Sequence, residues 1–300
     1  MVAAVKRELK WLVTGRMSQL GRALKEVLHE RHSTYICLGR EELDIRNKQE
    51  VHRIIQQEMP DVIVNTAAWT NVEEAEKNEK LARETNAIAP SSLAQEASKV
   101  GAKFIHISSD YVFSGSRQTP WDEYSITSPL SAYGRGKEEG EKLVLSAYES
   151  GSFVVRTSWL YSPWGKNFVK SITETAILES RNVKIVNDQI GQPTSAIELA
   201  TQIYVLANSS AKPGIYHASG GGQTSWFDLA QYIFRYFNQD PYRVLPISSK
   251  MYSSKVHRPE YSVLGHDRWF QEGLSPMRNW IEALEVLLPR VKQSILEEKN

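Results

Sequence analysis

The chain has 300 residues, of which 41% are hydrophobic and 24% charged, and its formal net charge is +1. This composition is typical of a globular protein with one large or two modest domains, and it excludes a disordered chain. The near-zero net charge gives no basic field that would favour nucleic acid or an anionic membrane surface as the partner.

A short apolar strand at residues 10–13 leads into a glycine-containing loop at residues 14–21, and an amphipathic helix follows to about His29. A strand, glycine loop and helix in this order surround a pyrophosphate with backbone N–H groups and the positive end of the helix. We therefore expect a dinucleotide to bind here. Ser18 occupies the middle glycine position of the Gly-x-x-Gly-x-x-Gly pattern, so this loop alone is equally compatible with a plain strand, turn and helix.

A second predicted strand covers residues 34–38 and ends in Gly39 and Arg40. In dinucleotide-binding sheets this strand end meets the adenosine ribose, where a carboxylate selects a free 2′-hydroxyl and an arginine suits a 2′-phosphate. Arg40, with Arg16 from the glycine loop as a second cation, therefore favours NADPH over NADH. The alternative is that both arginines are simply solvated surface residues.

The next predicted helix spans residues 48–58, and the β-branched run at residues 61–65 is typical of a fully buried parallel strand. Ala67 and Ala68 follow it, and small residues at a strand end allow a cofactor to lie against the backbone. They also occur in ordinary turns. A polar helix is expected from Val72 to about Ala97, and it carries Asn86.

An apolar strand at residues 104–107 leads to Ser109, and Tyr133 and Lys137 follow four residues apart on a predicted helix. This spacing places the two side chains on one helix face, where an ammonium would lower the pKa of the phenol. The phenol could then deliver a proton, while the Ser109 hydroxyl shares the negative charge of the same substrate oxygen. About one Tyr and Lys pair at this spacing is expected by chance in a chain of this composition. The interpretation therefore depends on the surrounding motifs.

Strands alternating with helices to residue 161 predict an α/β fold with a Rossmann-type doubly wound parallel sheet and right-handed crossovers. We assign residues 1–161 to this NAD(P)-binding domain. The alternation ends near Ser162, so residues 162–300 are predicted to form a smaller α/β substrate-binding domain. The segment 195–220 is an exception, because its helix and strand could return to the first sheet.

Eight stretches recur together in one known family: GRMSQLG (15–21), LDI (43–45), NTAAWTNVEEAE (65–76), ISSDYVFSG (107–115), YGRGK (133–137), RTSWLY (156–161), NDQIGQPT (187–194) and RPEYS (258–262). In this order they resemble the dTDP-4-dehydrorhamnose reductase family of extended short-chain dehydrogenases. The resemblance covers nearly the whole chain. It implies NAD(P)H-dependent reduction of a nucleotide-linked 4-keto-6-deoxy sugar, most simply dTDP-4-dehydro-L-rhamnose to dTDP-L-rhamnose, for polysaccharide or lipopolysaccharide synthesis.

The resemblance also implies a role for each matching position. Tyr133 would donate the proton, Lys137 would hold the nicotinamide ribose and tune Tyr133, and Ser109 would replace the usual threonine of the catalytic triad. The implied cofactor contacts are Gly15, Arg16, Ser18, Gln19, Leu20, Arg40, Asp44, Ile45, Ala67, Ala68, Trp69, Tyr133 and Lys137. The implied substrate contacts are Ser109, Asp110, Tyr111, Tyr133, Trp159 and Asn167. For Tyr111 and Trp159, a packing role stays open.

Three departures from the family pattern, Ser18, Trp69 and Ser114, leave the triad untouched and bear on cofactor affinity and sugar identity. One rival interpretation is a non-catalytic NADP-binding subunit like the β-subunit of methionine adenosyltransferase, which has a similar fold and keeps a Tyr-x-x-x-Lys pair. The stretches 156–159 and 188–194 favour the reductases. Another rival is an epimerase or dehydratase, but such dehydratases usually need further acidic groups, and Asp110 has no adjacent glutamate.

The remaining expectations concern location and partners. Cys37 lies in a predicted buried strand, is the only cysteine and fits a reducing cytoplasm; packing is favoured over nucleophilic chemistry because no base is placed beside it. The seven histidines have no metal-ligand spacing, so no metal is expected. We expect neither a membrane span nor a signal peptide. A nucleotide sugar is the expected partner, and a homodimer is the usual prior.

Overall fold

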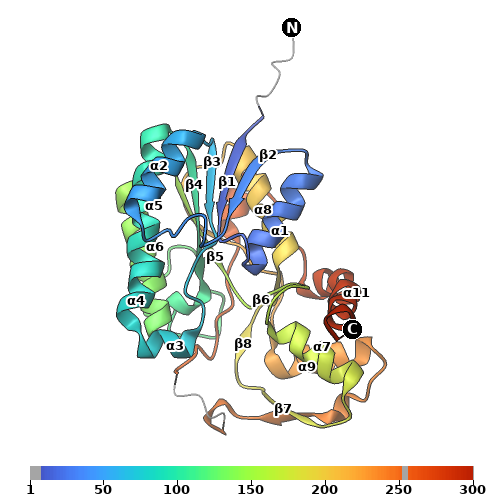
Figure 1. Ribbon diagram of the computed structural model, residues 1–300. Coiled ribbons are helices and arrows are strands. Elements are labelled where there is room, and N and C mark those ends of the chain that lie inside the picture. Colours follow the sequence, from blue (N-terminus) through green and yellow to red (C-terminus); the bar gives the residue numbers. More distant parts are fainter. Residues whose placement is uncertain (1–7, 252–255, 300) are drawn as a thin grey trace.

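The computed structural model describes residues 8–251 and 256–299, and its centre is a six-stranded parallel sheet (Figure 1). The strand order is β10-β5-β4-β3-β1-β2. Its strands are β1 (Lys10–Thr14), β2 (Thr34–Leu38), β3 (Val62–Asn65), β4 (Lys103–Ser109), β5 (Ser152–Thr157) and β10 (Gly214–His217). Because β1 pairs with β2 on one side and β3 on the other, the winding reverses at β1, where doubly wound sheets bind ligands at the carboxyl ends of their strands. The predicted fold class is confirmed.

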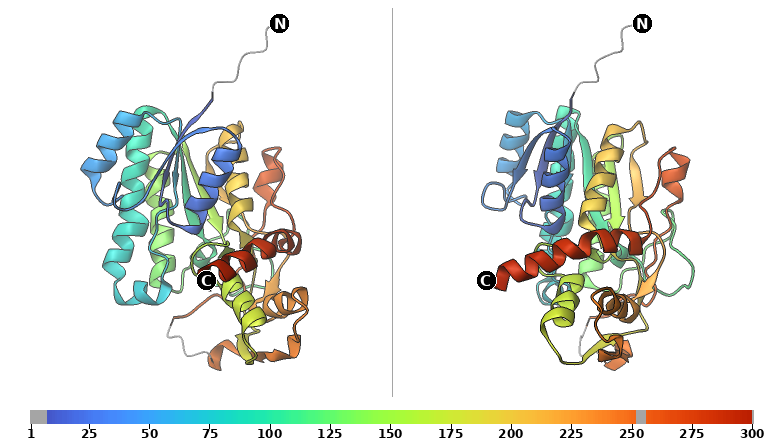
Figure 2. Two further views of the ribbon diagram at one scale, coloured as in Figure 1. Left: turned by 45° about the vertical axis from the view of Figure 1, so that its right-hand side comes forward. Right: turned by 90° about the vertical axis from the view of Figure 1, so that its right-hand side faces the viewer.

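Helices cover both faces of this sheet (Figures 1 and 2). On one face, α1 (Gln19–Glu30) and α8 (Ala196–Asn208) pack against apolar residues of β1, β3, β4 and β5. On the other face lie α2 (Lys48–Glu58), α5 (Ala89–Val100) and α6 (Ala132–Ala147). Burial of both faces explains why strands such as β3 are apolar at successive positions rather than at alternate ones.

The polar segment from Val72 is not the single helix that the sequence predicted. It divides into α3 (Val72–Lys77), α4 (Glu79–Arg83), the π-helical turn η1 (Glu84–Ile88) and α5. The Asn71 side chain caps α3, and α3 ends at Asn78, whose φ of −129° is not helical. The π turn carries Asn86 on an inward bulge, which is the kind of irregularity that often marks a functional position.

A smaller part of the molecule packs below the carboxyl edge of the sheet in the view of Figure 1. Its helices are α7 (Phe168–Leu178), α9 (Trp226–Tyr236) and α11 (Trp280–Lys299), which share one apolar core. Short strand pairs complete it: β6 (Leu160–Tyr161) with β9 (Thr194–Ser195), β7 (Val183–Val186) with β12 (Val244–Ile247), and β8 (Ile190–Gly191) with β11 (Thr224–Ser225). The short helical elements are η2 (Asp110–Val112), η3 (Pro241–Arg243), η4 (Ser249–Met251) and α10 (Asp267–Gln271).

The segment between residues 195 and 220 lies with the large sheet: β10 pairs in parallel with β5, and α8 packs on α1. The division of the chain at Ser162 into two domains stays a prediction. Cys37 differs from expectation because β2 is an edge strand of the sheet. Its thiol is only half-buried, and desolvation raises its pKa to about 11.

Candidate active site

The glycine loop has the backbone geometry that a dinucleotide site requires. Gly15 has a φ of +75°, and a Cβ there would lie 2.7 Å from the Thr66 hydroxyl. A Cβ at Gly21 would lie 2.2 Å from the Gly15 carbonyl oxygen, so both positions need glycine. The first turn of α1 follows directly, and the first N–H groups of a helix have no partner within it. The residues present therefore fit a pyrophosphate at this helix end.

Ser18 replaces the middle glycine of the loop without disturbing it. Its hydroxyl accepts the Gly21 N–H at 2.9 Å and thereby caps α1. The same hydroxyl lies 2.9 Å from the Thr66 hydroxyl, which in turn donates to the Thr14 carbonyl oxygen at 2.7 Å. Ser18 therefore connects the loop to the end of β3, and the space that a glycine would leave is used for a helix cap.

The adenosine end of the predicted site is rich in charge. Arg40 is largely exposed and lies 3.9 Å from Asp44, whose carboxylate is held more closely by Arg46 at 2.5 Å. That hydrogen bond lowers the pKa of Asp44 to about 2, so Asp44 is ionised. Ile45 is buried, and Arg16 forms an ion pair with Glu42. The sequence reasoning assigned no role to Glu42.

Asn86, which the sequence reasoning noted without assigning a role, fixes the loop after β3. Its Oδ1 accepts the Trp69 N–H at 2.8 Å, and its Nδ2 donates to the Trp69 carbonyl oxygen at 3.0 Å. Both bonds hold the backbone that follows Ala67 and Ala68. The Trp69 ring packs with Tyr133 and the small side chains Ala75, Ala82 and Ala132.

The predicted triad comes together where β4 ends and α6 begins. Ser109 ends β4, and its side chain lies close enough to the Tyr133 phenol to interact with it. The Tyr133 ring meets Tyr111 edge-on, with ring centroids 5.5 Å apart. Lys137 lies one turn further along α6, is fully buried and donates from Nζ to the Ile107 carbonyl oxygen at 2.5 Å. The Ser109 and Tyr133 hydroxyls thus lie next to each other, and Lys137 lies one helical turn from Tyr133.

The expected effect of Lys137 on the pKa of Tyr133 was wrong. Burial raises the Tyr133 pKa well above its ordinary value, and the charges that act on it are those of Asp110 and Tyr111. Lys137 is itself desolvated, which lowers its pKa to about 8, and its hydrogen bond goes to a backbone carbonyl rather than to the phenol. Tyr133 is therefore fully protonated at neutral pH, which is the form a proton donor needs.

Asp110 is a buried carboxyl group beside the triad. The Ser109 hydroxyl donates to its Oδ1 at 2.9 Å, and burial raises the pKa of Asp110 to about 6. Tyr111 is held next to it, and burial raises the pKa of that phenol to about 12. The Ser109 hydroxyl, which belongs to the predicted triad, is therefore hydrogen-bonded to Asp110.

A buried ion pair that the sequence did not reveal holds α6 onto the sheet. Arg156 on β5 donates to both carboxylate oxygens of Glu141 on α6, at 2.9 and 2.6 Å. Ser108 donates to the same carboxylate at 2.5 Å, and His217 on β10 lies 3.2 Å from the Arg156 guanidinium. Both charges are paired and hydrogen-bonded, as burial demands.

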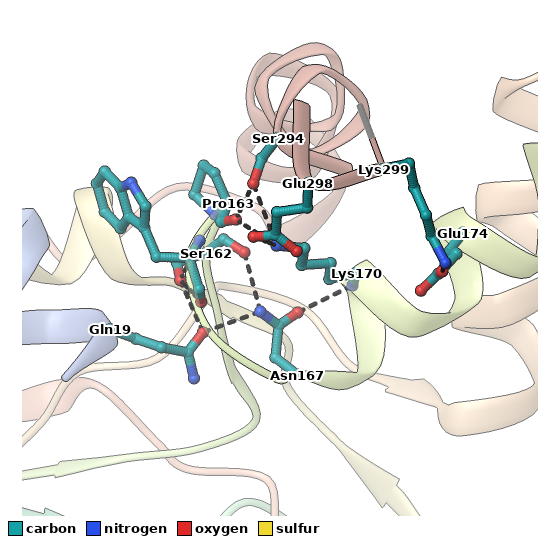
Figure 3. Close-up of polar contacts among 10 residues, drawn as sticks. Gln19, Ser162, Pro163, Asn167, Lys170, Glu174, Ser294, Glu298 and Lys299 are labelled. Atoms are coloured by element: carbon teal, nitrogen blue, oxygen red, sulfur yellow. Dashed lines mark hydrogen bonds and ion pairs between the residues drawn. The ribbon is translucent and has the colours of Figure 1, made fainter. Parts of the chain in front are cut away.

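The two residues predicted to contact the sugar beyond residue 150 lie in the smaller part. Trp159 has a φ of +43° and stacks on Trp226 with ring centroids 3.5 Å apart, while a Cβ at Gly191 would lie 2.4 Å from its indole. Asn167 accepts the Lys170 N–H at 2.9 Å and caps α7. Its Nδ2 donates to Gln19 at 3.1 Å (Figure 3). Its predicted sugar contact is untested and stays a prediction.

Gln19 connects the glycine loop to the smaller part of the molecule. Its Oε1 accepts from the Ser162 hydroxyl at 2.8 Å as well as from Asn167 (Figure 3). Leu20, the next residue, is buried in the core between α1 and the sheet. The side chain of Gln19 therefore contacts other protein groups, and only its backbone N–H faces the predicted phosphate position as a first-turn donor.

A cavity of about 1000 Å³ opens in the smaller part, between α7, β7, α9 and the segment around residue 257. Trp226 lines it and stacks on Trp159. Arg258 also lines it, and its charge partly offsets the rise that burial causes in the pKa of Tyr111. The cavity thus reaches residues that contact the triad region. Its basic lining residues are Arg181, Lys184, Lys250, His257 and Arg258.

Residues 8–251 and 256–299 contain neither a metal-binding cluster nor a membrane-spanning helix. No group of three or more His, Cys, Asp or Glu side chains there could hold a metal ion. No helix in these ranges combines the length and apolar character needed to cross a membrane.

The doubly wound sheet, the glycine loop and the Tyr133–Lys137 pair beside Ser109 place the chain in the class of Rossmann-type short-chain dehydrogenases and reductases. The family model described as RmlD substrate binding domain matches residues 9–293. The chain belongs to the dTDP-4-dehydrorhamnose reductase family, as its sequence motifs predicted.

Relatives with established names cover almost the full chain. The chain is 39% identical to the dTDP-4-keto-6-deoxy-D-glucose reductase of Streptomyces niveus, over 93% of this chain and 96% of the relative. It is 40% identical to the dTDP-4-dehydrorhamnose reductase of Streptomyces griseus, over 93% of each. A solved dTDP-4-dehydrorhamnose reductase from Bacillus anthracis, in complex with NADP, is 36% identical with a TM-score of 0.88, covering 95% of this chain and 99% of that one.

Proposed function

We propose that this protein is an NADPH-dependent 4-ketoreductase of a nucleotide-activated 4-keto-6-deoxy sugar, with dTDP-4-dehydro-L-rhamnose as its substrate and dTDP-L-rhamnose as its product. The observation that carries the proposal is the pair of hydroxyls, Ser109 and Tyr133, at the end of β4 with Lys137 behind them. This arrangement occurs in a chain 40% identical to a named reductase of that sugar.

A reduced nicotinamide, when bound, supplies the hydride for the carbonyl carbon. Tyr133 binds the carbonyl oxygen and gives it a proton, which the raised pKa of the phenol keeps available. Ser109 would turn its hydroxyl from Asp110 to the same oxygen, donate a second hydrogen bond and stabilise the developing charge. Lys137 holds the ribose of the dinucleotide, with its Nζ oriented by the Ile107 carbonyl oxygen.

We assign the nucleoside diphosphate of the substrate to the large cavity. Its basic lining side chains complement a pyrophosphate, and the Trp226 and Phe168 rings offer apolar surface to a base and a deoxyribose. Trp159 stacks on Trp226 of this cavity, and Tyr111 meets Tyr133 edge-on, so these two rings would guide the sugar from the cavity to the triad. Asp110 lies beside them and would accept a sugar hydroxyl.

The dinucleotide would lie along the carboxyl edge of β1, β2 and β3. Gly15, Ser18, Gln19 and Leu20 would receive its pyrophosphate, and Ala67, Ala68 and Trp69 would flank its nicotinamide half. Asp44 and Ile45 would border adenine, and Arg16 and Arg40 would meet a 2′-phosphate. The first domain would then be residues 1–161 together with the returning segment 195–220, and the rest of residues 162–300 would form the second. A cytoplasmic location and a homodimer complete the proposal.

The experiment is an NADPH oxidation assay with purified full-length protein and a panel of dTDP- and UDP-linked 4-keto-6-deoxy sugars. We expect the fastest turnover with dTDP-4-dehydro-L-rhamnose. If no 4-keto sugar is reduced by folded protein that binds NADPH, the chain is a dinucleotide-binding subunit rather than an enzyme.

A further inference from the structure

One carboxylate lies at the carboxyl end of β2 without a role in the account above. Glu42 follows β2 by four residues, and its Oε2 accepts the Gly39 N–H at 2.7 Å. Its Oε1 forms an ion pair with the Arg16 guanidinium. Arg16 is fixed from the other side as well, because its backbone N–H donates to the Leu38 carbonyl oxygen at 3.0 Å.

These contacts bring the glycine loop, the end of β2 and the carboxylate to one point. A Cβ at Gly39 would lie 3.0 Å from Glu42 Oε2 and 3.7 Å from Arg16 Nη2. This strand end is where a doubly wound sheet meets the adenosine ribose. A carboxylate here accepts from the 2′- and 3′-hydroxyls of NADH, whereas a guanidinium here pairs with the 2′-phosphate of NADPH. The chain holds both groups, paired with each other.

The two arginines near this point differ in their surroundings. The Arg16 guanidinium has Glu42 as a close partner, whereas Arg40 has a 77% exposed side chain and lies 3.9 Å from Asp44. The Asp44 carboxylate is itself bound by Arg46 through Nε at 3.0 Å and Nη2 at 2.5 Å. Glu42 is therefore the carboxylate that directly opposes a 2′-phosphate at Arg16, and Arg40 is the cation that offsets it.

We infer that Glu42 determines the choice between the two dinucleotides. In wild-type protein its carboxylate keeps NADH usable by accepting from the ribose hydroxyls, and it weakens NADPH binding by occupying Arg16 and repelling the 2′-phosphate. This inference rests on the proposed dinucleotide-dependent function. It predicts an enzyme that binds both dinucleotides with similar affinity, rather than one restricted to NADPH.

The test is calorimetric titration of full-length protein with NADPH and with NADH, for wild type, Glu42→Gln and Glu41→Gln. Glutamine keeps the shape of Glu42 and an oxygen for the Gly39 N–H but removes the charge. We expect Glu42→Gln to bind NADPH about tenfold more tightly and NADH about tenfold more weakly, as the gain or loss of one charge-assisted contact implies. Glu41 is also exposed, but the contacts with Gly39 and Arg16 belong to Glu42, so Glu41→Gln should leave both affinities unchanged.

Other results would overturn the inference. If Glu42→Gln weakens NADPH binding, Glu42 orients Arg16 toward the phosphate and does not oppose it. If both affinities change equally, or not at all, Glu42 does not discriminate. If wild-type protein binds neither dinucleotide, the proposed function fails first. Circular dichroism and melting temperature establish that each variant is folded, and Arg16→Gln gives a second route: it should weaken NADPH binding and spare NADH.

Discussion

At the scale of single residues, burial keeps the phenol of Tyr133 protonated, as the proposed role of proton donor requires. Tyr133→Phe keeps the ring and its edge-on contact with Tyr111 but removes the hydroxyl. Turnover with saturating NADPH and keto sugar should fall by about 100-fold or more, while the dissociation constant of NADPH changes little. Tyr124→Phe, on an exposed ring in the loop before α6, is the control. Near-normal turnover of Tyr133→Phe would remove Tyr133 from the reaction.

The buried carboxyl of Asp110 predicts a pH dependence of stability. Its pKa is raised from 3.8 to about 6, so the folded protein binds more protons than the unfolded chain between these values. The stabilisation is complete below about pH 4 and is lost as the pH rises through about 6. Asp110→Asn cannot titrate, so its unfolding free energy relative to wild type should increase between pH 4 and pH 8, by at most about 3 kcal/mol.

Urea unfolding of both proteins at a series of pH values measures this difference. Titratable groups that both proteins share change both unfolding free energies equally, so their contributions cancel. A constant difference across this range would mean that Asp110 ionises normally in the folded protein.

The proximity of Ser109, Tyr133 and Lys137 could be predicted from the sequence because these residues lie in short motifs. The four-residue spacing of Tyr133 and Lys137 and the position of Ser109 at a strand end are local features. Asn86, Glu42 and the Glu141–Arg156 pair could not be predicted, because their roles depend on partners that only the folded chain brings close. The pKa of Tyr133 was predicted with the wrong sign, since spacing reveals proximity but not desolvation.

At the scale of elements, α6 must pack closely on the π turn to place Tyr133 and Lys137. A Cβ at Gly140 would lie 2.2 Å from the Asn86 carbonyl oxygen, whereas one at Gly136 would lie 3.5 Å from the Asn86 Cβ, an ordinary contact. Gly140→Ala should therefore push α6 outward, cost about 1–3 kcal/mol of unfolding free energy and reduce turnover. Gly136→Ala should be neutral or stabilising, because alanine favours helix.

Equilibrium urea unfolding and NADPH oxidation rates compare the two variants, which differ only in position along one helix. Equal stability of the two variants would contradict the close packing of α6 on the π turn.

Elements with a clear apolar pattern were predictable, and α2 occupies the predicted residues 48–58. The division of the segment between Val72 and Val100 into several helices was not predictable. The π turn places Asn86 against the Trp69 backbone, and this contact depends on tertiary structure. The C-terminal helix α11 runs from Trp280 to Lys299 and continues through Pro289. Packing of its apolar side chains against α7 and α9 outweighs the missing backbone donor.

At the scale of the whole molecule, α11 contacts both parts of the chain, and Figure 3 shows its contacts with the smaller part. Arg290 on α11 forms two hydrogen bonds with Glu26 on α1, at 2.7 and 2.8 Å. Near its end, Ser294 and Glu298 bind the buried Lys170 amine, at 3.1 and 2.7 Å, and Pro163 O accepts from the same amine at 3.1 Å. The helix therefore fixes the smaller part relative to the glycine loop.

Lys170→Met keeps the apolar stem of this side chain but removes the amine. We expect a loss of about 1–2 kcal/mol of unfolding free energy, because hydrogen bonds to Pro163 and Ser294 disappear from a buried position. Lys166→Met, at an exposed position four residues earlier, should change stability by less than about 0.5 kcal/mol. Thermal and urea unfolding measure both; equal effects would mean that the Lys170 contacts add no stability.

The large sheet was predictable because its strands alternate with helices along the chain. The smaller part was not, since its strands β6, β8, β9 and β11 are two residues long and owe their pairing to neighbours distant in sequence. The cavity was not predictable either, because residues from α7, β7, α9 and the segment around residue 257 meet there only in the folded chain.

The central claim, that this chain reduces a 4-keto sugar, is tested most directly by following the transferred hydrogen. Full-length protein is incubated with NADPH deuterated at C4 of the nicotinamide, using each C4 stereoisomer in turn, and with dTDP-4-dehydro-L-rhamnose. The product is then analysed by mass spectrometry and NMR. We predict dTDP-L-rhamnose carrying deuterium at sugar C4 from one stereoisomer only. A product without deuterium, or no product from folded protein that binds NADPH, would contradict the account.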